Sequence, residues 1–152
     1  MNISFRSILI FAFILLISSC QKSEFDFYDL EEVITKIVDS DEKPLILALD
    51  RITDVRNFGA IARSAECSGV HAIVLPKNDS VPVSADAIRT STGALLEIPI
   101  CKVNHMKDAI FLVQSLGLKI IAGTEKSETS MYDAPFEEPC MLIMGNEETG
   151  VH

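Results

Sequence analysis

Two short segments of the sequence carry polar and charged side chains in arrangements that could take part in chemistry. The first, DRITDVRNFGAIARSAE at residues 50–66, places Arg63 six positions after Asn57. If a helix begins near Phe58, Arg63 lies roughly 9 Å along its axis, and its side chain leans back toward the helix N-terminus. The two side chains can then face one crevice. The alternative is that Asn57 only caps the helix while Arg63 pairs with Glu66.

The second segment is GNEETG at residues 145–150, where two glycines bracket a polar turn. It lacks the lysine and the following serine or threonine of a nucleoside triphosphate loop, which argues against that kind of site. The adjacent carboxylates of Glu147 and Glu148 would suit a cationic ligand or ribose hydroxyls. The turn follows the apolar run 140–144, which is typical of a buried central strand. Open α/β folds bind their ligands at turns of this kind, at the carboxyl edge of a parallel sheet.

The apolar pattern of the chain predicts the elements that would position these segments. Apolar residues either recur with helical spacing, as at Leu30, Val33, Ile34 and Ile37, or form short continuous runs. Helices are expected at 26–40, 58–69, 105–117 and part of 84–96, and strands at 44–50, 71–76, 98–103, 118–125 and 140–145. The polar stretch 126–139 is the one sizeable loop. Five strands separated by helical segments predict an α/β fold, with a mostly parallel sheet and helices on both faces.

Length and composition indicate a folded, one-domain protein. The chain has 152 residues, of which 48% are hydrophobic and 23% charged, and this balance argues against disorder. The net charge of −9 disfavours nucleic-acid binding over most of the surface. Part of the acidic excess is local, because eight acidic and three basic residues lie within 22–43. A modest basic spot remains at Arg51, Arg56 and Arg63, which enclose the single acid Asp54.

The cysteines and histidines do not form the pattern of a metal site. The four cysteines are widely spaced, with no Cys-x-x-Cys pair and no histidine at ligand spacing, so we expect no bound metal. Cys67, Cys101 and Cys140 lie in or beside apolar segments and are expected to be small buried hydrophobic side chains.

The first twenty residues differ in character from the rest. Residues 1–20 contain one arginine, an apolar run from Ile8 to Ile17, and small residues before Cys20. This is the layout of a secretory signal, and the ending ISSC resembles a bacterial lipoprotein box in which Cys20 carries the lipid. The apolar run is brief for a membrane-spanning helix. A short anchor, or a start codon placed on unrelated upstream sequence, are the alternatives.

Together, the two chemically suggestive segments resemble a known family. DRITDVRNFGAIARSAECSGVHAIVLP and LIMGNEETG closely resemble motifs 1 and 2 of the SpoU (TrmH) family of RNA ribose 2′-O-methyltransferases, in the SPOUT superfamily. DAIRTSTGALLEIPICKV and IIAGTE are also similar to the family, and FDFYDLEEV resembles the subgroup that methylates a guanosine of 23S ribosomal RNA. The resemblance covers roughly residues 25–151. It implies a partial methyltransferase domain at 44–152, after the signal-like segment at 1–20 and an acidic linker with an amphipathic helix at 21–43.

The resemblance implies a reaction, a cofactor and roles for individual residues. A methyl group would pass from S-adenosyl-L-methionine to a ribose 2′-hydroxyl, which must be oriented and helped to lose its proton. By motif match, Arg63 would be the hydrogen-bond and charge partner of that hydroxyl, and Asn57 and Glu147 would shape the catalytic site. Arg56 and Arg63 would contact RNA. The residues expected to bind the cofactor through their backbone are Thr124, Gly145, Asn146 and Gly150.

The same resemblance implies RNA, in particular 23S ribosomal RNA, as a partner, as well as a homodimer and a cytoplasmic location. It also implies a SPOUT-type trefoil knot, an exception to the rule that chains are not knotted. The third motif, which closes the knot, is not found before His152, and the subgroup's small RNA-binding domain is not found either. The chain is therefore expected to be an inactive fragment that lacks its C-terminal knot-closing segment. Two alternatives stay open, a non-catalytic RNA- or protein-binding module and a membrane-associated, exported lipoprotein.

Overall fold

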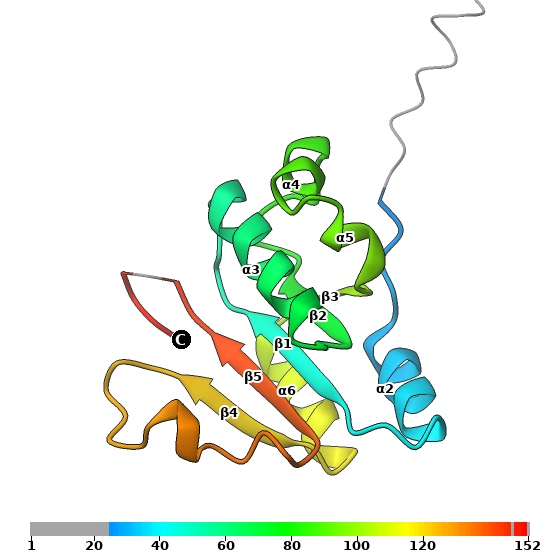
Figure 1. Ribbon diagram of the computed structural model, residues 1–152, viewed down its shortest axis with the longest axis vertical. Helices are drawn as coiled ribbons and strands as arrows, with labels where there is room; N and C mark the ends of the chain where they lie inside the picture. Colours follow the sequence, from blue (N-terminus) through cyan, green and yellow to red (C-terminus); the bar gives the residue numbers. More distant parts are fainter. Residues whose placement is uncertain (1–24, 147, 152) are drawn as a thin grey trace, which may run out of the picture.

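A five-stranded parallel sheet forms the centre of the protein in our computed structural model, which describes residues 25–146 and 148–151 (Figure 1). The strand order is β3-β2-β1-β5-β4, and all four neighbouring pairs are parallel. The predicted parallel sheet is therefore confirmed. The strands are β1 (Leu45–Leu49), β2 (Ala72–Pro76), β3 (Ile100–Val103), β4 (Lys119–Gly123) and β5 (Cys140–Met144).

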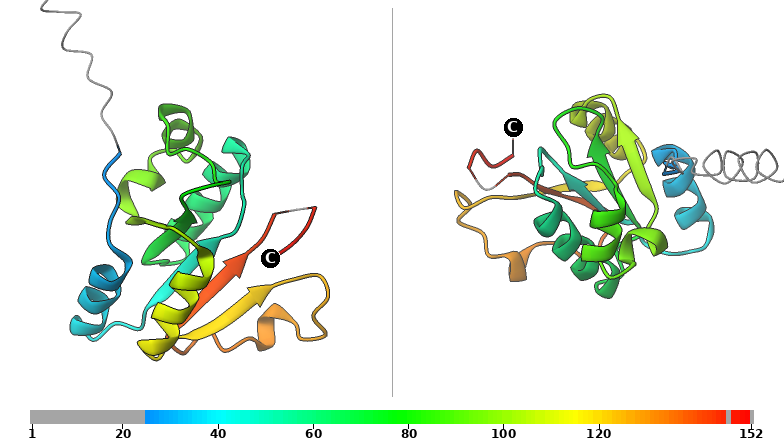
Figure 2. Two further views of the ribbon diagram at one scale, coloured as in Figure 1. Left: turned by 180° about the vertical axis from the view of Figure 1, so that it is seen from behind. Right: turned by 90° about the horizontal axis from the view of Figure 1, so that it is seen from above.

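Helices cover both faces of the sheet, as the sequence predicts (Figure 2). One face carries α3 (Val55–Cys67), α4 (Ala85–Thr90) and α5 (Ala94–Glu97). The other face carries α2 (Leu30–Asp39) and α6 (Met106–Ser115). The long loop between β4 and β5 contains one 3-10 turn, Met131–Asp133.

Alternation along the central strand divides the hydrophobic core between the two faces. Leu47 and Leu49 of β1 join the cluster under α3, α4 and α5, while Ile46 and Ala48 join the cluster under α2 and α6. Successive strand residues point to opposite faces, so a strand covered on both sides needs the continuous apolar run seen in the sequence. Burying each of the larger side chains stabilises the fold by roughly 1.5–3 kcal/mol.

One helix boundary differs from the expectation in a way that affects the candidate site. The Asp54 side chain accepts hydrogen bonds from the amides of Arg56 and Asn57, each at 2.8 Å, so α3 begins at Val55. The expected start near Phe58 is wrong by three residues. The physical reason is that Asp54, and not Asn57, caps the helix by satisfying its first free amides.

The lead-in to the sheet packs along its β3 edge. Phe25 packs against the cluster under α3, α4 and α5, and Tyr28 forms a parallel bridge with Cys101 of β3. The signal-like segment 1–20, with Cys20, lies outside the described residues. Within the part of the chain that the structure describes, no helix is long and apolar enough to cross a membrane.

Candidate functional site

The strand order of the sheet reverses between β1 and β5. From β1 the chain moves outward to β2 and β3, then crosses to β4 at the opposite edge and returns to β5 beside β1. At such a reversal point, the loops after neighbouring strands run in opposite directions and leave a crevice at the carboxyl ends of the strands. Open α/β sheets bind their ligands in this crevice. In this protein the crevice should lie beyond Leu49 and Met144, which are direct neighbours in the register.

Three strand ends bring predicted site residues together at this edge. Met144 at the end of β5 pairs with Leu49 of β1 on one side and with Gly123 of β4 on the other. The residues that come next in the chain are therefore neighbours, namely Asp50, Thr124 and Gly145. Thr124 is exposed and Gly145 is half-buried. Gly145 has no side chain that could cover the backbone at this strand end.

The turn after β5 folds back on the end of its own strand. Asn146 Oδ1 accepts hydrogen bonds from the amides of Glu148 and Thr149, each at 2.9 Å, and from the Thr149 hydroxyl at 3.1 Å. The Gly150 amide closes the turn by donating to the Asn146 carbonyl oxygen at 2.9 Å. A Cβ atom on Gly145 would lie 2.0 Å from the carbonyl carbon of Gly150, so only glycine permits this approach.

Helix α3 carries the other predicted site residues. Asn57 lies in its first turn, at the same edge as the strand ends, and Arg63 lies near its middle, roughly 9 Å further along the axis. Six residues correspond to about 120° of rotation between the two positions, so their side chains leave different faces of the helix. A shared crevice would require the long Arg63 side chain to reach back toward the helix N-terminus. Glu147, the third predicted catalytic residue, lies outside the described residues.

Arg56 and Arg63 form an exposed basic stripe on α3. Because they are seven residues apart, they project from nearly the same face of the helix, and both are exposed. The alternative expectation of an ion pair between Arg63 and Glu66 is wrong, since none of the ion pairs among the described residues joins them. The stripe presents two guanidinium groups that could contact an anionic backbone.

The structure shows specific contacts of Arg51, whereas the sequence assigns it only to a modest basic spot. It directly follows β1, with a left-handed φ of 57° that is uncommon for a residue with a Cβ atom. Its Nη2 atom lies 3.6 Å from Asp50 Oδ2 and 3.5 Å from the carbonyl oxygen of Gly150. The sequence shows that Arg51 directly follows a predicted strand, but it does not indicate the contact with Gly150.

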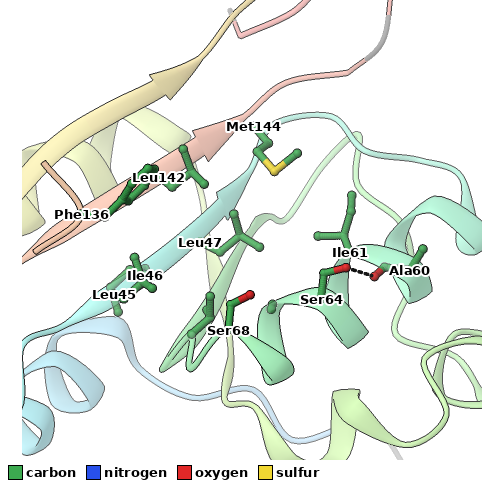
Figure 3. Close-up of a pocket in the computed structure, with 12 residues that line it drawn as sticks. Leu45, Ile46, Leu47, Ala60, Ile61, Ser64, Ser68, Phe136, Leu142 and Met144 are labelled. Atoms are coloured by element: carbon green, nitrogen blue, oxygen red, sulfur yellow. Dashed lines mark hydrogen bonds between the residues drawn. The ribbon is translucent and has the colours of Figure 1, made fainter. Parts of the chain in front are cut away.

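An apolar groove opens beside the candidate site, between α3 and the strands β1 and β5 (Figure 3). It has a volume of about 510 Å³. The Ser64 hydroxyl in its wall donates to the carbonyl of Ala60 in the same helix at 3.1 Å. None of the predicted site residues that the structure describes lines the groove, although Met144 at the end of β5 does. The lining residues are Leu45, Ile46, Leu47, Ala60, Ile61, Ser64, Ala65, Ser68, Val70, Phe136, Leu142 and Met144.

The thiols that the structure describes are not arranged for catalysis. Burial raises the pKa of the Cys101 thiol to about 12, with the nearby Asp29 carboxylate adding to the effect, and burial also raises the pKa of Cys140. Both thiols are therefore protonated, and poorly nucleophilic, at neutral pH. The expectation that Cys67 is buried is wrong, because it lies one turn after Arg63 on the solvent-facing side of α3. Within 25–146 and 148–151, no three His, Cys, Asp or Glu side chains are grouped to hold a metal ion.

A parallel α/β sheet with a closed, glycine-bracketed turn at its reversal point defines a domain suited to bind a ligand at its carboxyl edge. Residues 44–152 match the model of the SpoU rRNA Methylase family. The chain belongs to this family, which confirms the resemblance that the two motifs indicate.

Individual relatives agree with this assignment. The chain is 31% identical over 121 residues to the 23S rRNA (guanosine-2′-O-)-methyltransferase RlmB of Yersinia pestis, and the match covers 80% of this chain and 49% of that protein. It is 32% identical over 122 residues to the enzyme of the same name from Pseudomonas aeruginosa, which covers 80% of this chain and 48% of the relative. The chain thus spans about half the length of the curated relatives that it matches.

Solved structures confirm the fold. The SpoU methyltransferase AviRb from Streptomyces viridochromogenes, in complex with AdoMet, superimposes with a TM-score of 0.72 at 25% identity, over 84% of this chain and 51% of that one. The AdoMet-bound rRNA methyltransferase from Sinorhizobium meliloti gives a TM-score of 0.67 at 27% identity, over 84% of this chain and 47% of that one. The parallel sheet with helices on both faces is therefore that of SpoU methyltransferases.

Proposed function

We propose that the protein is an RNA methyltransferase domain that transfers a methyl group from S-adenosyl-L-methionine to a ribose 2′-hydroxyl of ribosomal RNA. The observation that carries this proposal is the juxtaposition of Thr124, Gly145 and the closed turn 146–150 at the reversal point of the sheet. Membership of the SpoU family, and relatives named as 23S rRNA guanosine 2′-O-methyltransferases, support it. Because the chain spans about half of those relatives, the activity of the whole protein is part of the proposal.

The edge of the sheet fits a cofactor that is recognised through the backbone. Thr124 and Gly145 follow paired strand residues, Gly145 has no side chain, and open space surrounds the position that a Cβ atom would take on Gly150. A flat purine ring can therefore approach main-chain donors and acceptors closely. We assign S-adenosyl-L-methionine to Thr124, Gly145, Asn146 and Gly150. When bound, the cofactor supplies an electrophilic methyl group on a sulfonium.

Activation of the ribose hydroxyl falls to side chains of this chain. The hydroxyl must be oriented, and the charge that develops on its oxygen must be stabilised as its proton leaves. Arg63 is exposed and can donate charge-assisted hydrogen bonds to that oxygen, which would lower the pKa of the hydroxyl. A guanidinium stays protonated, so Arg63 does not accept the proton itself. Asn57, at the same edge, and Glu147 would orient the ribose.

The substrate would be held mainly by its phosphates. The net charge of −9 leaves little of the surface attractive to RNA, so the stripe of Arg56 and Arg63 is the proposed contact with the RNA backbone. We propose 23S ribosomal RNA as the target and a homodimer as the assembly of the full-length protein. A cytoplasmic location follows from that substrate, since ribosomal RNA and the methyl donor are found there.

Methyl transfer tests the proposal directly. The full-length protein is incubated with 23S ribosomal RNA and S-adenosyl-L-methionine carrying a labelled methyl group, and the RNA is digested to nucleosides. The expected product is a labelled 2′-O-methylated nucleoside, and Arg63→Ala should lower the rate by about 100-fold or more. Arg89→Ala is the matched control, because Arg89 lies on α4 in an ion pair with Asp86. Lack of label with the full-length wild-type protein contradicts the activity, and full activity of Arg63→Ala contradicts the role given to Arg63.

A further inference from the structure

Arg51 connects the two chain segments that form the candidate site. It directly follows β1, and its Nη2 atom lies 3.5 Å from the carbonyl oxygen of Gly150, near the long limit of a hydrogen bond. The same atom lies 3.6 Å from Asp50 Oδ2, in an ion pair whose side chains are only 29% and 10% exposed. Arg51 Nε is buried and makes no hydrogen bond to the described residues. The guanidinium is therefore largely withdrawn from water at the point where the two segments meet.

The backbone of Arg51 adopts a conformation that favours glycine. Its φ of 57° is left-handed, which brings the Cβ atom of any L-residue close to the neighbouring carbonyl oxygen. A glycine would avoid this steric cost. The side chain of Arg51 instead makes a contact with Gly150 that a glycine could not make.

The turn that Arg51 contacts has hydrogen bonds that are mostly internal. The amides of Glu148, Thr149 and Gly150 all donate to oxygen atoms of Asn146. The side chains of Glu148 and Thr149 are exposed. Val151, which follows the turn, packs against the cluster under α2 and α6. The contact with Arg51 adds a link to the end of β1, and its loss should let the turn open more often and expose these amides.

We propose that Arg51 is a positioning residue that holds the Gly150 carbonyl and so keeps the turn 146–150 facing the strand ends. The same Nη2 atom lies 3.6 Å from Asp50 Oδ2, so Asp50 helps to hold the guanidinium in place. Asp50 is itself fixed, because its amide donates to the carbonyl oxygen of Met144 at 2.8 Å and so joins the ends of β1 and β5. The link runs from the reversal point of the sheet, through one side chain, to the turn. Its value for binding the cofactor rests on the function proposed above.

Three variants of the full chain test this link. Arg51→Gly removes the side chain and is compatible with the left-handed backbone, so it should not weaken the fold. Arg51→Lys keeps the positive charge but places it on a compact ammonium at the end of a shorter side chain, which should weaken the contact with Gly150. Arg89→Ala is the control, because it removes an exposed arginine from an ion pair on α4.

Amide hydrogen exchange measured by NMR reports how often the turn opens. Arg51→Gly is expected to raise exchange at Thr149 and Gly150 by about tenfold, the effect of losing one charge-assisted contact. Exchange at Leu47 in β1 should stay at the wild-type rate. Arg51→Lys should give a smaller rise at the turn, and Arg89→Ala none.

Wild-type exchange at the turn in Arg51→Gly would overturn the proposal, and so would an equal rise in β1, since Arg51 would then act on the whole fold. If Arg51→Gly does not fold, Arg51→Lys decides, because a rise restricted to the turn supports the link and its absence overturns it. Titration with S-adenosyl-L-methionine separates this inference from the proposed function. Weaker binding by Arg51→Gly extends the role of Arg51 to the cofactor site, whereas a wild-type chain that does not bind counts against the function and leaves the exchange result intact.

Discussion

Replacing Gly145 with alanine tests whether the turn after β5 must lie against the end of its strand. The added Cβ atom would lie 2.0 Å from the carbonyl carbon of Gly150, 2.2 Å from its oxygen and 2.3 Å from the Val151 nitrogen. Ordinary contact begins at 3.4 Å, so the nearest of these atoms must move by about 1.4 Å, the difference between 3.4 and 2.0. All three are backbone atoms, so the whole turn must shift.

The size of the effect follows from this overlap. Forcing extra atoms into a packed position costs roughly 1–3 kcal/mol. In a domain of this size each kcal/mol lowers the melting temperature by about 3–5 °C, so a fall of about 3–15 °C is expected for Gly145→Ala. A displaced turn should also lose its contact with Arg51, and S-adenosyl-L-methionine should bind at least about tenfold more weakly if the turn contributes one good hydrogen bond.

Thermal unfolding followed by circular dichroism, with NMR shifts of the Gly150 amide, measures both effects. The matched control is Gly123→Ala at the neighbouring strand end, where the new Cβ would meet the Ile143 carbonyl oxygen at 3.5 Å, an ordinary contact. If Gly145→Ala melts within about 1 °C of that control, and its Gly150 amide keeps the wild-type shift, the close approach is not required and the reasoning is refuted.

Three further predictions concern the elements that support the site. Asp54→Ala should lower the free energy of unfolding by about 1 kcal/mol, because two amides of α3 lose their acceptor, and an unchanged urea midpoint would contradict the cap. Gly59→Ala places a Cβ atom 2.6 Å from Thr90 Cγ2 and should cost roughly 1–3 kcal/mol by pushing α3 from α4, so wild-type stability would count against this packing. The folded state retains the Cys101 proton up to a pKa of about 12, while the unfolded thiol loses it near ~8.5. The free energy of unfolding should therefore fall as pH rises between these values, by at most about 1.4 kcal/mol per pH unit from this group. Cys101→Ala should show a flatter dependence in urea titrations over the same window, and equal slopes would show that the buried thiol does not contribute.

The strands could be predicted from the sequence, but their order could not. Within the predicted strands, residues 45–49 and 140–144 are apolar without interruption, and this is what a strand buried on both faces requires. Such a run does not encode which strand lies beside it. That β5 pairs with β1, in a register that sets Met144 beside Leu49, is decided by packing across the whole sheet.

The candidate site, too, could be predicted from the sequence only in part. Thr124 and Gly145 lie at the ends of the predicted strands 118–125 and 140–145, in segments that resemble the family, so their meeting at one edge could be expected. The apolar pattern predicts a start of α3 near Phe58, but the helix begins at Val55. Asp54 caps it there by accepting two hydrogen bonds from backbone amides. The contact of Arg51 with Gly150 joins distant parts of the chain and depends on one left-handed residue. Neither the contact between distant residues nor the left-handed backbone leaves a pattern in the local sequence.

The exposure of individual side chains on α3 could not be predicted from the sequence either. Cys67 and Ala65 are both small and lie in the same helix, yet Ala65 is buried in the core and Cys67 faces solvent. The difference is the direction in which each leaves the helix relative to the sheet. The size and polarity of the two side chains do not distinguish them, whereas the packing of α3 against β1 and β2 does.

The most direct test of the central claim is an NMR titration of the isotopically labelled chain with S-adenosyl-L-methionine. The account predicts saturable shifts of the amides at the carboxyl edge of the sheet, namely Thr124, Gly145, Asn146 and Gly150. An absence of shifts at high ligand concentration, or shifts confined to the apolar groove around Ile61 and Leu142, would contradict it.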